Sequence, residues 1–365
     1  MKKSLAIQIL TLMCALPMCA QTSFTYKVNG VFPVDSFDGN TVYMMRMDKN
    51  KKDHAVIDSA KVSGRGFTFE GQTDGHYYCR IMVEDTAFPL ILDEGTITAD
   101  FLNPSATGTK YNDRLCKYLT DWGALADPYK KYIDSVRQAK PAPREWQPLA
   151  SEYFERNVRQ PLTALVEKNI LENTDNGIAL MVLTQNEHIL GKERIKALLP
   201  QLGDWLPTLQ PMKDLVARYT ADENTAEGKP FADIVGTDLD GNVSRLSDYV
   251  GKGKYVLADM WASWCGPCKA EIPNIAELYN TYKDKGLVVL GIATWDKIEN
   301  IKKALPEHNI TWPQLFDKDN GVGNVYGVNG IPHIILFAPD GTILARNLRG
   351  DQMKQTVKEA MEKSK

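Results

Sequence analysis

The sequence predicts a small all-β region over residues 21–110, a central helical region over 111–221 and an α/β domain over 231–365. In the first region, short apolar runs alternate with turn-forming residues, whereas from about residue 112 the apolar residues recur every three or four positions, as on one face of a helix. After residue 231, apolar runs of strand length alternate with helical segments, which is typical of an α/β sheet. A chain of 365 residues has room for two or three domains.

Residues 1–20 have the features of a secretory signal peptide: a positive start with two lysines, an apolar stretch from Leu5 to Leu16 and a small-residue cleavage point at Ala20. The apolar stretch is too short to span a bilayer comfortably. We therefore expect export to the periplasm or cell envelope. The residue before Cys19 is Met18 rather than the small residue of a lipoprotein signal, which leaves a lipid anchor at Cys19 as the less favoured alternative.

The β region consists of short runs, such as residues 41–45 and 66–70, separated by Asp, Gly and Asn residues that favour turns. Several short strands at this spacing predict a small sandwich-like fold. On paper His54, Asp58 and Asp93 could form a metal site, but we interpret them as scattered surface polar residues.

The helical region carries apolar stripes, such as Leu115, Tyr118 and Trp122, which we interpret as core rather than as a cofactor site. Residues 222–230 are small, polar and charged. That composition predicts a linker to the α/β domain.

Two further cysteines lie outside the α/β domain, Cys79 in a strand-like segment and Cys116 in a helical one. An oxidising compartment would let them form a disulfide. Because the region is not a small cysteine-dense scaffold, we favour two separate thiols that behave as small hydrophobic residues.

The α/β domain is organised around residues 255–273, where an apolar run typical of a buried strand leads into a helix that carries Cys265 and Cys268. The first backbone N–H groups of a helix lack partners and favour a thiolate, so Cys265 is the expected nucleophile. Cys268, one turn further, can close a disulfide with it, while Gly266 and Pro267 permit a tight turn and a helix start. No second cysteine or histidine pair is present to complete a four-ligand zinc site.

The remaining elements of this domain follow from apolar runs and turn formers. We expect a hairpin around the turn at residues 238–242. The other expected elements are a strand at 287–293, a helix at 297–305, strands at 333–337 and 342–347 and a closing helix at 352–363, with an inserted stretch at 310–328.

Residues 261–269, Trp-Ala-Ser-Trp-Cys-Gly-Pro-Cys-Lys, resemble the active site of thioredoxins. Asp259 and Pro273 stand where thioredoxins have a buried carboxylate and a helix-kinking proline, and Gly330-Ile331-Pro332 resembles the loop whose cis-proline faces the disulfide. Glu271 is typical of the extracytoplasmic branch, the thioredoxin-like proteins of cytochrome c maturation and their AhpC-TSA-like relatives. The resemblance covers about the last 140 residues and implies a thioredoxin fold there. The β region resembles the domain that precedes thioredoxin modules in secreted Bacteroidetes proteins.

This resemblance implies an exported thiol-disulfide oxidoreductase that exchanges a Cys265–Cys268 dithiol with the disulfides of protein clients, as a reductase rather than an oxidant. It implies no cofactor besides that disulfide, an unidentified thiol as electron donor and no metal; the near-balanced charge gives no indication of nucleic acid. A homodimer through the N-terminal regions is an open expectation. The expected catalytic residues are Cys265, Cys268, Asp259 and Glu271, and the expected substrate-binding residues are Trp264, Gly266, Pro267, Ile331 and Pro332.

Two alternatives remain open. A thiol peroxidase of the peroxiredoxin type, with antioxidant activity, shares the overall pattern, but such enzymes carry a threonine where this chain has Ala262. The second alternative is a binding protein in which the thioredoxin-like domain acts as a redox sensor. The intact Cys265–Cys268 pair together with Asp259 and Pro332 favours the oxidoreductase.

Overall fold

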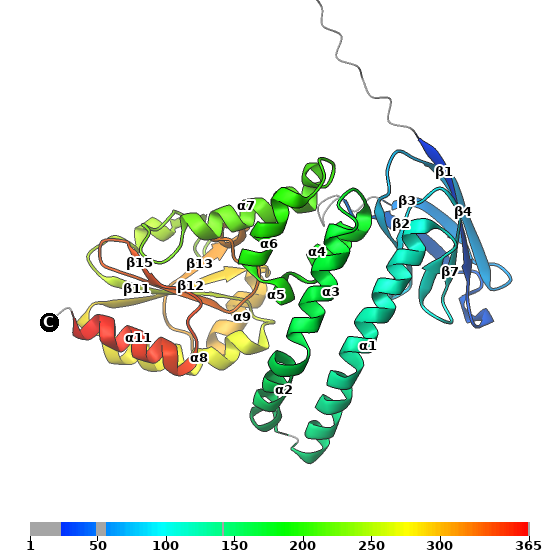
Figure 1. Cartoon of the computed structure of the whole chain (residues 1–365). Coiled ribbons are helices and arrows are strands. Elements are labelled where there is room, and N and C mark those ends of the chain that lie inside the picture. The colour runs from blue at the N-terminus through cyan, green and yellow to red at the C-terminus, as the bar shows by residue number, and fades with distance from the viewer. Residues whose placement is uncertain (1–22, 49–55, 141, 364–365) are drawn as a thin grey trace, which may run out of the picture. The chain divides into compact units, whose positions relative to one another are not determined.

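The computed structural model describes residues 23–48, 56–140 and 142–363. The chain divides into two compact units, Met1–Pro211 and Met212–Lys365, which are described separately (Figure 1). The expected signal peptide, Cys19 and His54 lie outside the described residues. Within the part of the chain that the structure describes, no helix is long and apolar enough to cross a membrane.

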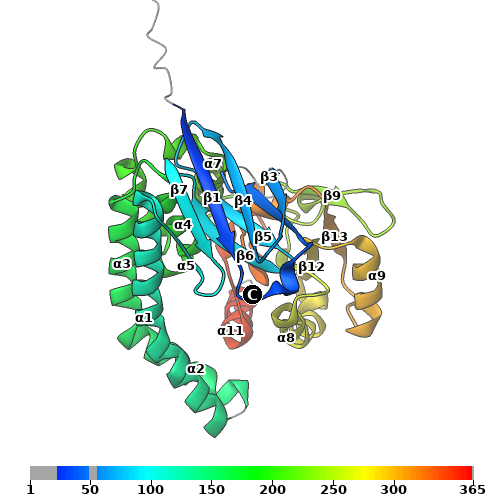
Figure 2. The ribbon, with the colours of Figure 1, turned by 90° about the vertical axis from the view of Figure 1, so that its right-hand side faces the viewer.

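The first unit contains two four-stranded sheets, with strand orders β4-β1-β7-β8 and β3-β2-β5-β6. Figure 2 shows β7, β1 and β4 side by side. Alternate residues of β1 are buried, as expected for a strand with one face on a core. The ring centroid of Phe88, in β6, lies 4.9 Å from that of Phe101, which directly follows β7 of the other sheet. The two sheets therefore share a core. The strands are β1 (Phe24–Val31), β2 (Thr41–Arg46), β3 (Val56–Lys61), β4 (Gly66–Thr73), β5 (Tyr78–Val83), β6 (Thr86–Ile91), β7 (Gly95–Asp100) and β8 (Ser105–Thr107).

The helical region follows the sheets, which confirms the predicted order of an all-β part and a helical part. The helices are α1 (Lys110–Ala139), α2 (Pro143–Asn157), α3 (Arg159–Leu171), α4 (Gly177–Gln185), α5 (Glu187–Leu190) and α6 (Lys192–Leu198). Helix α4 is apolar and buried almost throughout, and the side chain of Asn176 caps it by accepting a hydrogen bond from the Ile178 N–H. Burial on all sides explains why α4 shows little amphipathic periodicity.

Two buried polar residues attach the helices to the sheets. The Asn112 amide donates to the Ile91 carbonyl at 2.8 Å and accepts from the Ile91 N–H at 3.0 Å. Asp93 accepts a hydrogen bond from the Tyr111 N–H at the start of α1. The sequence suggested that Asp93 is a surface residue, and this expectation is wrong. Asp93 is buried and holds the start of α1. The β and helical regions form one compact unit.

Cys79 and Cys116 are both free thiols, as favoured from the sequence. Cys79 is fully buried in β5, and burial raises its pKa well above the ordinary value. Cys116 is partly buried in α1.

The second unit is built on a seven-stranded sheet of order β10-β9-β13-β12-β11-β14-β15. The strands are β9 (Val235–Thr237), β10 (Val243–Arg245), β11 (Tyr255–Trp261), β12 (Leu287–Thr294), β13 (Gln314–Asp317), β14 (His333–Phe337) and β15 (Ile343–Ala345). The helices are α7 (Gln210–Asn224), α8 (Gly266–Tyr282), α9 (Ile298–Glu307), α10 (Gly321–Tyr326) and α11 (Gly350–Glu362). Strand β11 is central, parallel to β12 and antiparallel to β14. This arrangement confirms the thioredoxin fold expected for the C-terminal domain. The inserted stretch at 310–328 contains β13 and α10.

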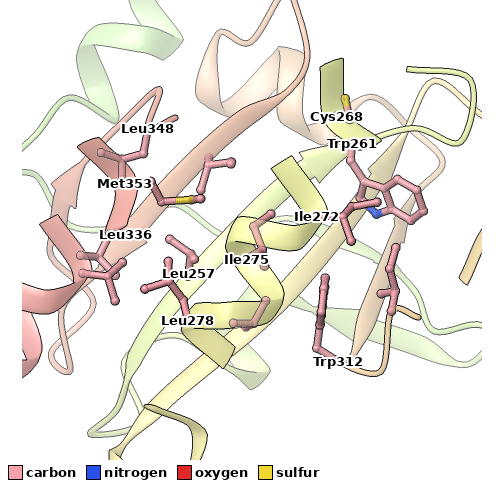
Figure 3. Packing of buried hydrophobic residues seen from close by; sticks show 14 of the residues in the cluster. Leu257, Trp261, Cys268, Ile272, Ile275, Leu278, Trp312, Leu336, Leu348 and Met353 are labelled. Atoms are coloured by element: carbon pink, nitrogen blue, oxygen red, sulfur yellow. The ribbon is translucent and has the colours of Figure 1, made fainter. Parts of the chain in front are cut away.

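Alternation along β11 divides the core between the two faces of the sheet. Leu257 and Trp261 pack with α8, α9 and α11, whereas Val256, Ala258 and Met260 pack with α10 on the other face. Figure 3 shows Ile272, Ile275 and Leu278 of α8 pointing into the first cluster. Figure 1 shows α8 and α11 side by side over the sheet. Burial of each large apolar side chain in these clusters stabilises the fold by about 1.5–3 kcal/mol. This packing holds β11 in place, and the cysteines follow directly after its last residue.

The segment expected to be a linker, residues 222–230, is fastened to the second unit. Its first residues complete α7, and Thr225 is buried. Arg346 forms an ion pair with Asp222 at 3.0 Å and donates hydrogen bonds to the carbonyls of Asp222 and Thr225. The Gly228 N–H donates to the Ile343 carbonyl at 2.8 Å. The polar composition therefore reflects hydrogen bonding to Arg346 and β15 rather than an extended tether.

Candidate active site

The two cysteines lie where β11 gives way to α8. Cys265 is the N-cap of α8, and Cys268 lies in its first turn. They form a disulfide with a Cα–Cα distance of 5.3 Å, and both are buried. The Cys268 N–H points at the Cys265 sulfur at 3.1 Å. When the disulfide opens, this N–H and the positive end of the helix dipole stabilise a thiolate on Cys265.

The loop before β14 faces the disulfide. Its Ile331–Pro332 peptide bond is cis, and the Ile331 carbonyl oxygen lies 3.7 Å from the Cys265 sulfur. The antiparallel pairing of β14 with β11 places this loop beside the end of β11, because His333 pairs with Met260. The structure thus brings together Cys265, Ile331 and Pro332, as the sequence predicted.

Two exposed tryptophans adjoin the cysteines. Trp264 is 60% exposed and donates its indole N–H to the Trp295 carbonyl at 3.0 Å. Trp295 is 38% exposed, has a left-handed backbone with φ 54°, and donates its indole N–H to Asn320 at 2.7 Å. A bulky residue in this conformation is unusual and is found where the surroundings enforce it. The hydrogen bonds hold both indole N–H groups, which leaves their apolar rings available at the surface.

The neighbouring Asp296 holds the active-site loop. It accepts a hydrogen bond from the Ser263 N–H at 2.7 Å. Burial would raise the pKa of Asp296, but hydrogen bonds from Ser263, Lys297 and Asn300 outweigh burial and keep the pKa below its usual range. Asp296 is therefore ionised near neutral pH and anchors the backbone two residues before Cys265.

Trp261 serves the packing of the core. It is 1% exposed, and its indole N–H donates to the Gln314 amide oxygen at 3.0 Å. Gly291 leaves room for this amide, because a Cβ there would lie 2.1 Å from the Gln314 oxygen.

Asp259 is a buried carboxyl group on the α8 face of the sheet. It is 2% exposed, and its Oδ1 has no hydrogen-bond partner among the described residues. Burial raises the pKa of Asp259 to about 7, an effect that the positive charge of Arg349 opposes and the negative charge of Glu271 adds to. A carboxyl group with this pKa can accept and return a proton near neutral pH.

Glu271 and Arg349 join the helices around Asp259. Glu271 accepts hydrogen bonds from the Gly350 N–H at 3.0 Å and from Asn274 at 3.1 Å, so its carboxylate caps the start of α11. Arg349 donates hydrogen bonds to the carbonyls of Leu348 and Pro332. The catalytic role expected for Glu271 stays a prediction, and its observed contacts serve the docking of α11 onto α8.

Three residues of this site were not predicted from the sequence. Trp295 and Asp296 directly follow β12, at the strand edge where the cysteines also lie, and this shared edge was a usable signal. Arg349 stands in a polar turn before a helix and has no such signal, because its contacts depend on how α11 docks. In the described part of the chain, no group of three or more His, Cys, Asp or Glu side chains could hold a metal ion.

Residues 228–346 match the AhpC/TSA family, and residues 26–115 match a domain of unknown function, DUF4369. The thiol-disulfide oxidoreductase ResA of Bacillus thuringiensis subsp. konkukian is 31% identical over 145 residues, which are 40% of this chain and 82% of ResA. ResA of Geobacillus thermodenitrificans is 32% identical over 147 residues, 40% of this chain and 83% of that protein.

Among solved structures, the thioredoxin domain of a thiol-disulfide oxidoreductase from Bacteroides vulgatus is 41% identical and covers 37% of this chain and 96% of that domain, with a TM-score of 0.34. The geometry of the Cys265–Cys268 disulfide and the sequence identity over most of the length of ResA both indicate a thiol-disulfide oxidoreductase. The chain belongs to the thioredoxin-like AhpC/TSA family and is one of its thiol-disulfide oxidoreductases.

Proposed function

We propose that this chain is an exported oxidoreductase that reduces disulfides in protein clients through Cys265 and Cys268. The observation that carries the proposal is the Cys265 sulfur at a helix N-terminus, 3.7 Å from the Ile331 carbonyl oxygen. The buried carboxyl group of Asp259 lies on β11, the strand that leads to the cysteines. The leader at residues 1–20 supports export.

The reaction begins with the Cys265 thiolate attacking one sulfur of a client disulfide. A mixed disulfide forms, and the client's other sulfur leaves as a thiolate. Cys268 then loses its proton to Asp259, directly or through one water, and attacks the Cys265 sulfur. This second step forms the Cys265–Cys268 disulfide and releases the reduced client. The client gains two electrons, and a thiol donor must later return two electrons to the enzyme.

Client binding is assigned to the surface around Cys265. The carbonyl of Ile331, beside cis Pro332, is placed to pair with an extended client segment as an added strand. Trp264 and Trp295 present apolar rings next to that segment. Gly266 and Pro267 lie between the cysteines, where the client disulfide must approach.

The reducing direction is supported by the Gly-Pro pair between the cysteines, which resembles the reducing members of the family. The peroxidase alternative is not favoured, because Ala262 replaces the threonine of peroxiredoxins and Cys265 is engaged with Cys268. The first unit is assigned a role in docking or dimerisation rather than in a bond-making step, since no group of His, Cys, Asp or Glu side chains among its described residues could hold a metal ion.

Two measurements test this proposal. Reduction of insulin disulfides with a thiol donor should exceed peroxide consumption, and the opposite ratio would favour a peroxidase. The redox potential of the Cys265–Cys268 pair distinguishes a reductase from an oxidant. A value of about −270 mV, as in thioredoxin, supports a reductase, and a value of about −120 mV would make the protein an oxidant.

A further inference from the structure

Asp259 is surrounded by few charged groups. Its strand neighbours in register, Gly291 of β12 and Ile334 of β14, are uncharged. From α8 the negative charge of Glu271 acts on it, and from the N-cap of α11 the positive charge of Arg349 acts on it. Arg349 follows Leu348, whose N–H donates at 3.1 Å to the carbonyl of Ile334, the strand neighbour of Asp259. His333 alternates to the opposite face of the sheet, because it pairs with Met260. Arg349 is thus the positive group that acts on Asp259 from these elements.

Arg349 also contacts the loop that faces the disulfide. Its guanidinium group donates to the Pro332 carbonyl through one nitrogen and to the Leu348 carbonyl through the other. The adjacent Ile331 carbonyl lies 3.7 Å from the Cys265 sulfur. The planar guanidinium fork holds two carbonyls in a fixed geometry and remains positively charged at any pH the protein tolerates. One side chain therefore contacts the client-binding loop and acts by its charge on the buried carboxyl group.

We propose that Arg349 is a positioning residue that holds the Pro332 loop and supplies the positive charge that keeps Asp259 able to accept the Cys268 proton near neutral pH. The inference rests on the proposed role of Asp259. It assigns two roles to Arg349. The positive charge acts on Asp259, and the two hydrogen bonds of the guanidinium group hold the Pro332 loop.

The two tasks have different consequences when the residue is changed. Without the charge, the effect of burial on Asp259 is less opposed, so its pKa rises further above about 7. Above its pKa Asp259 is ionised and can act as a base; a higher pKa therefore moves the pH midpoint of the second step upward. A shift of about one pH unit would slow that step about tenfold at pH values below both midpoints. Arg349→Lys keeps the charge but loses the fork.

The experiment uses the full-length reduced protein and a chromogenic aromatic disulfide whose two halves are released in turn. The first absorbance phase reports attack by Cys265, and the second reports attack by Cys268. Second-phase rates are measured between pH 5 and 9 for the parent, Arg349→Gln, Arg349→Lys and the control Lys354→Gln. Lys354 lies on the same helix but pairs with Glu277.

We expect Arg349→Gln to raise the midpoint of the second phase by about one pH unit, while Arg349→Lys and Lys354→Gln keep the parental midpoint. Both Arg349 variants should raise the KM for insulin, and Lys354→Gln should not. A parental pH profile in a folded Arg349→Gln protein would overturn the inference. If Arg349→Gln does not fold, Arg349→Met, which is neutral and similar in length, takes its place under the same criteria.

Asp259→Asn separates this inference from the proposed function. If Asp259→Asn keeps the parental second-phase profile, the role of Asp259 itself is wrong. If Asp259→Asn slows the second phase and removes its pH dependence but Arg349→Gln changes nothing, only the inference about Arg349 fails. In the double variant, the Arg349→Gln change should produce no further midpoint shift.

Discussion

Both units of this chain contain buried polar groups, but Asp259 of the second unit differs in its hydrogen bonding from Asp93 and Asn112 of the first. In the first unit, Asp93 and Asn112 give their hydrogen bonds to the backbone and so attach α1 to the sheets. In the second unit, Asp259 is equally inaccessible, yet its Oδ1 has no hydrogen-bond partner among the described residues. A buried carboxyl group without full hydrogen bonding is costly to charge. Asp93 and Asn112 therefore serve the structure of the first unit, whereas Asp259 is the group that we propose for proton transfer in the second unit.

The largest effect should come from the cysteines. Cys265→Ser should abolish disulfide exchange because it removes the attacking sulfur, while Cys268→Ser should trap mixed disulfides with clients because it removes only the resolving sulfur. Non-reducing gels of cell-envelope extracts would detect the adducts. Stable adducts with Cys265→Ser but not with Cys268→Ser would reverse the two roles.

The next largest effect should come from Asp259→Asn. We expect the second half-reaction to slow about 10²-fold at neutral pH, since a general base is lost. Single-turnover rates between pH 6 and 8 measure the effect, with the exposed Asp284→Asn as control. Unchanged rates in Asp259→Asn, together with slowing in Glu271→Gln, would move the role to Glu271.

Asp259→Asn should also change how stability depends on pH. The pKa of Asp259 rises from 3.8 to about 7 on folding, so between these values the unfolded chain releases a proton that the folded chain keeps. Parental stability should therefore fall as pH rises through this window, by up to about 4 kcal/mol. Denaturant titrations at pH 4 and 8 should show this fall in the parent and not in Asp259→Asn.

Fragments test how independent the second unit is. A fragment of residues 212–365 should reduce a generic disulfide at nearly the full-length rate, because the site residues all lie within it. A fragment of residues 228–365 should be less stable by about 3 kcal/mol, because the partly buried Arg346 loses Asp222 and Thr225. Chemical denaturation measures both. A folded 212–365 fragment without activity would show that the first unit completes the site.

The smallest effect should come from the exposed aromatic surface. Trp295→Ala should raise the KM for a protein client about fivefold, equivalent to about 1 kcal/mol, and leave the rate with a small disulfide unchanged. Val243→Ala is the control, because Val243 is 69% exposed on β10, in the same unit. An equal effect on protein and small substrates would assign Trp295 to the structure of the loop instead.

The sequence predicted the elements whose signal is local. Strand β11, the cysteine helix and β14 follow from apolar runs and turn formers, and the strand predicted at 333–337 agrees with the structure. Strand β13 was missed because Gln314–Asp317 is short and partly polar, and its place depends on pairing with β12. The helical character of residues 222–224 was missed because their partner, Arg346, lies more than a hundred residues away.

The candidate site divides in the same way. Cys265, Cys268, Asp259 and Pro332 were found because their chemistry and spacing are visible in the chain. The capping role of Glu271 could not be predicted, because it depends on Gly350, 79 positions later.

The bond from Glu271 to Gly350 also sets an order of events during synthesis. The cysteines, Asp259 and Glu271 are all translated well before residues 349 and 350. Until the C-terminal helix has been made and has docked, Glu271 lacks its Gly350 donor and Asp259 lacks the charge of Arg349. A growing chain therefore carries the complete cysteine motif but not the electrostatic surroundings of the finished site. The segment that supplies these contacts is synthesised 79 positions after Glu271.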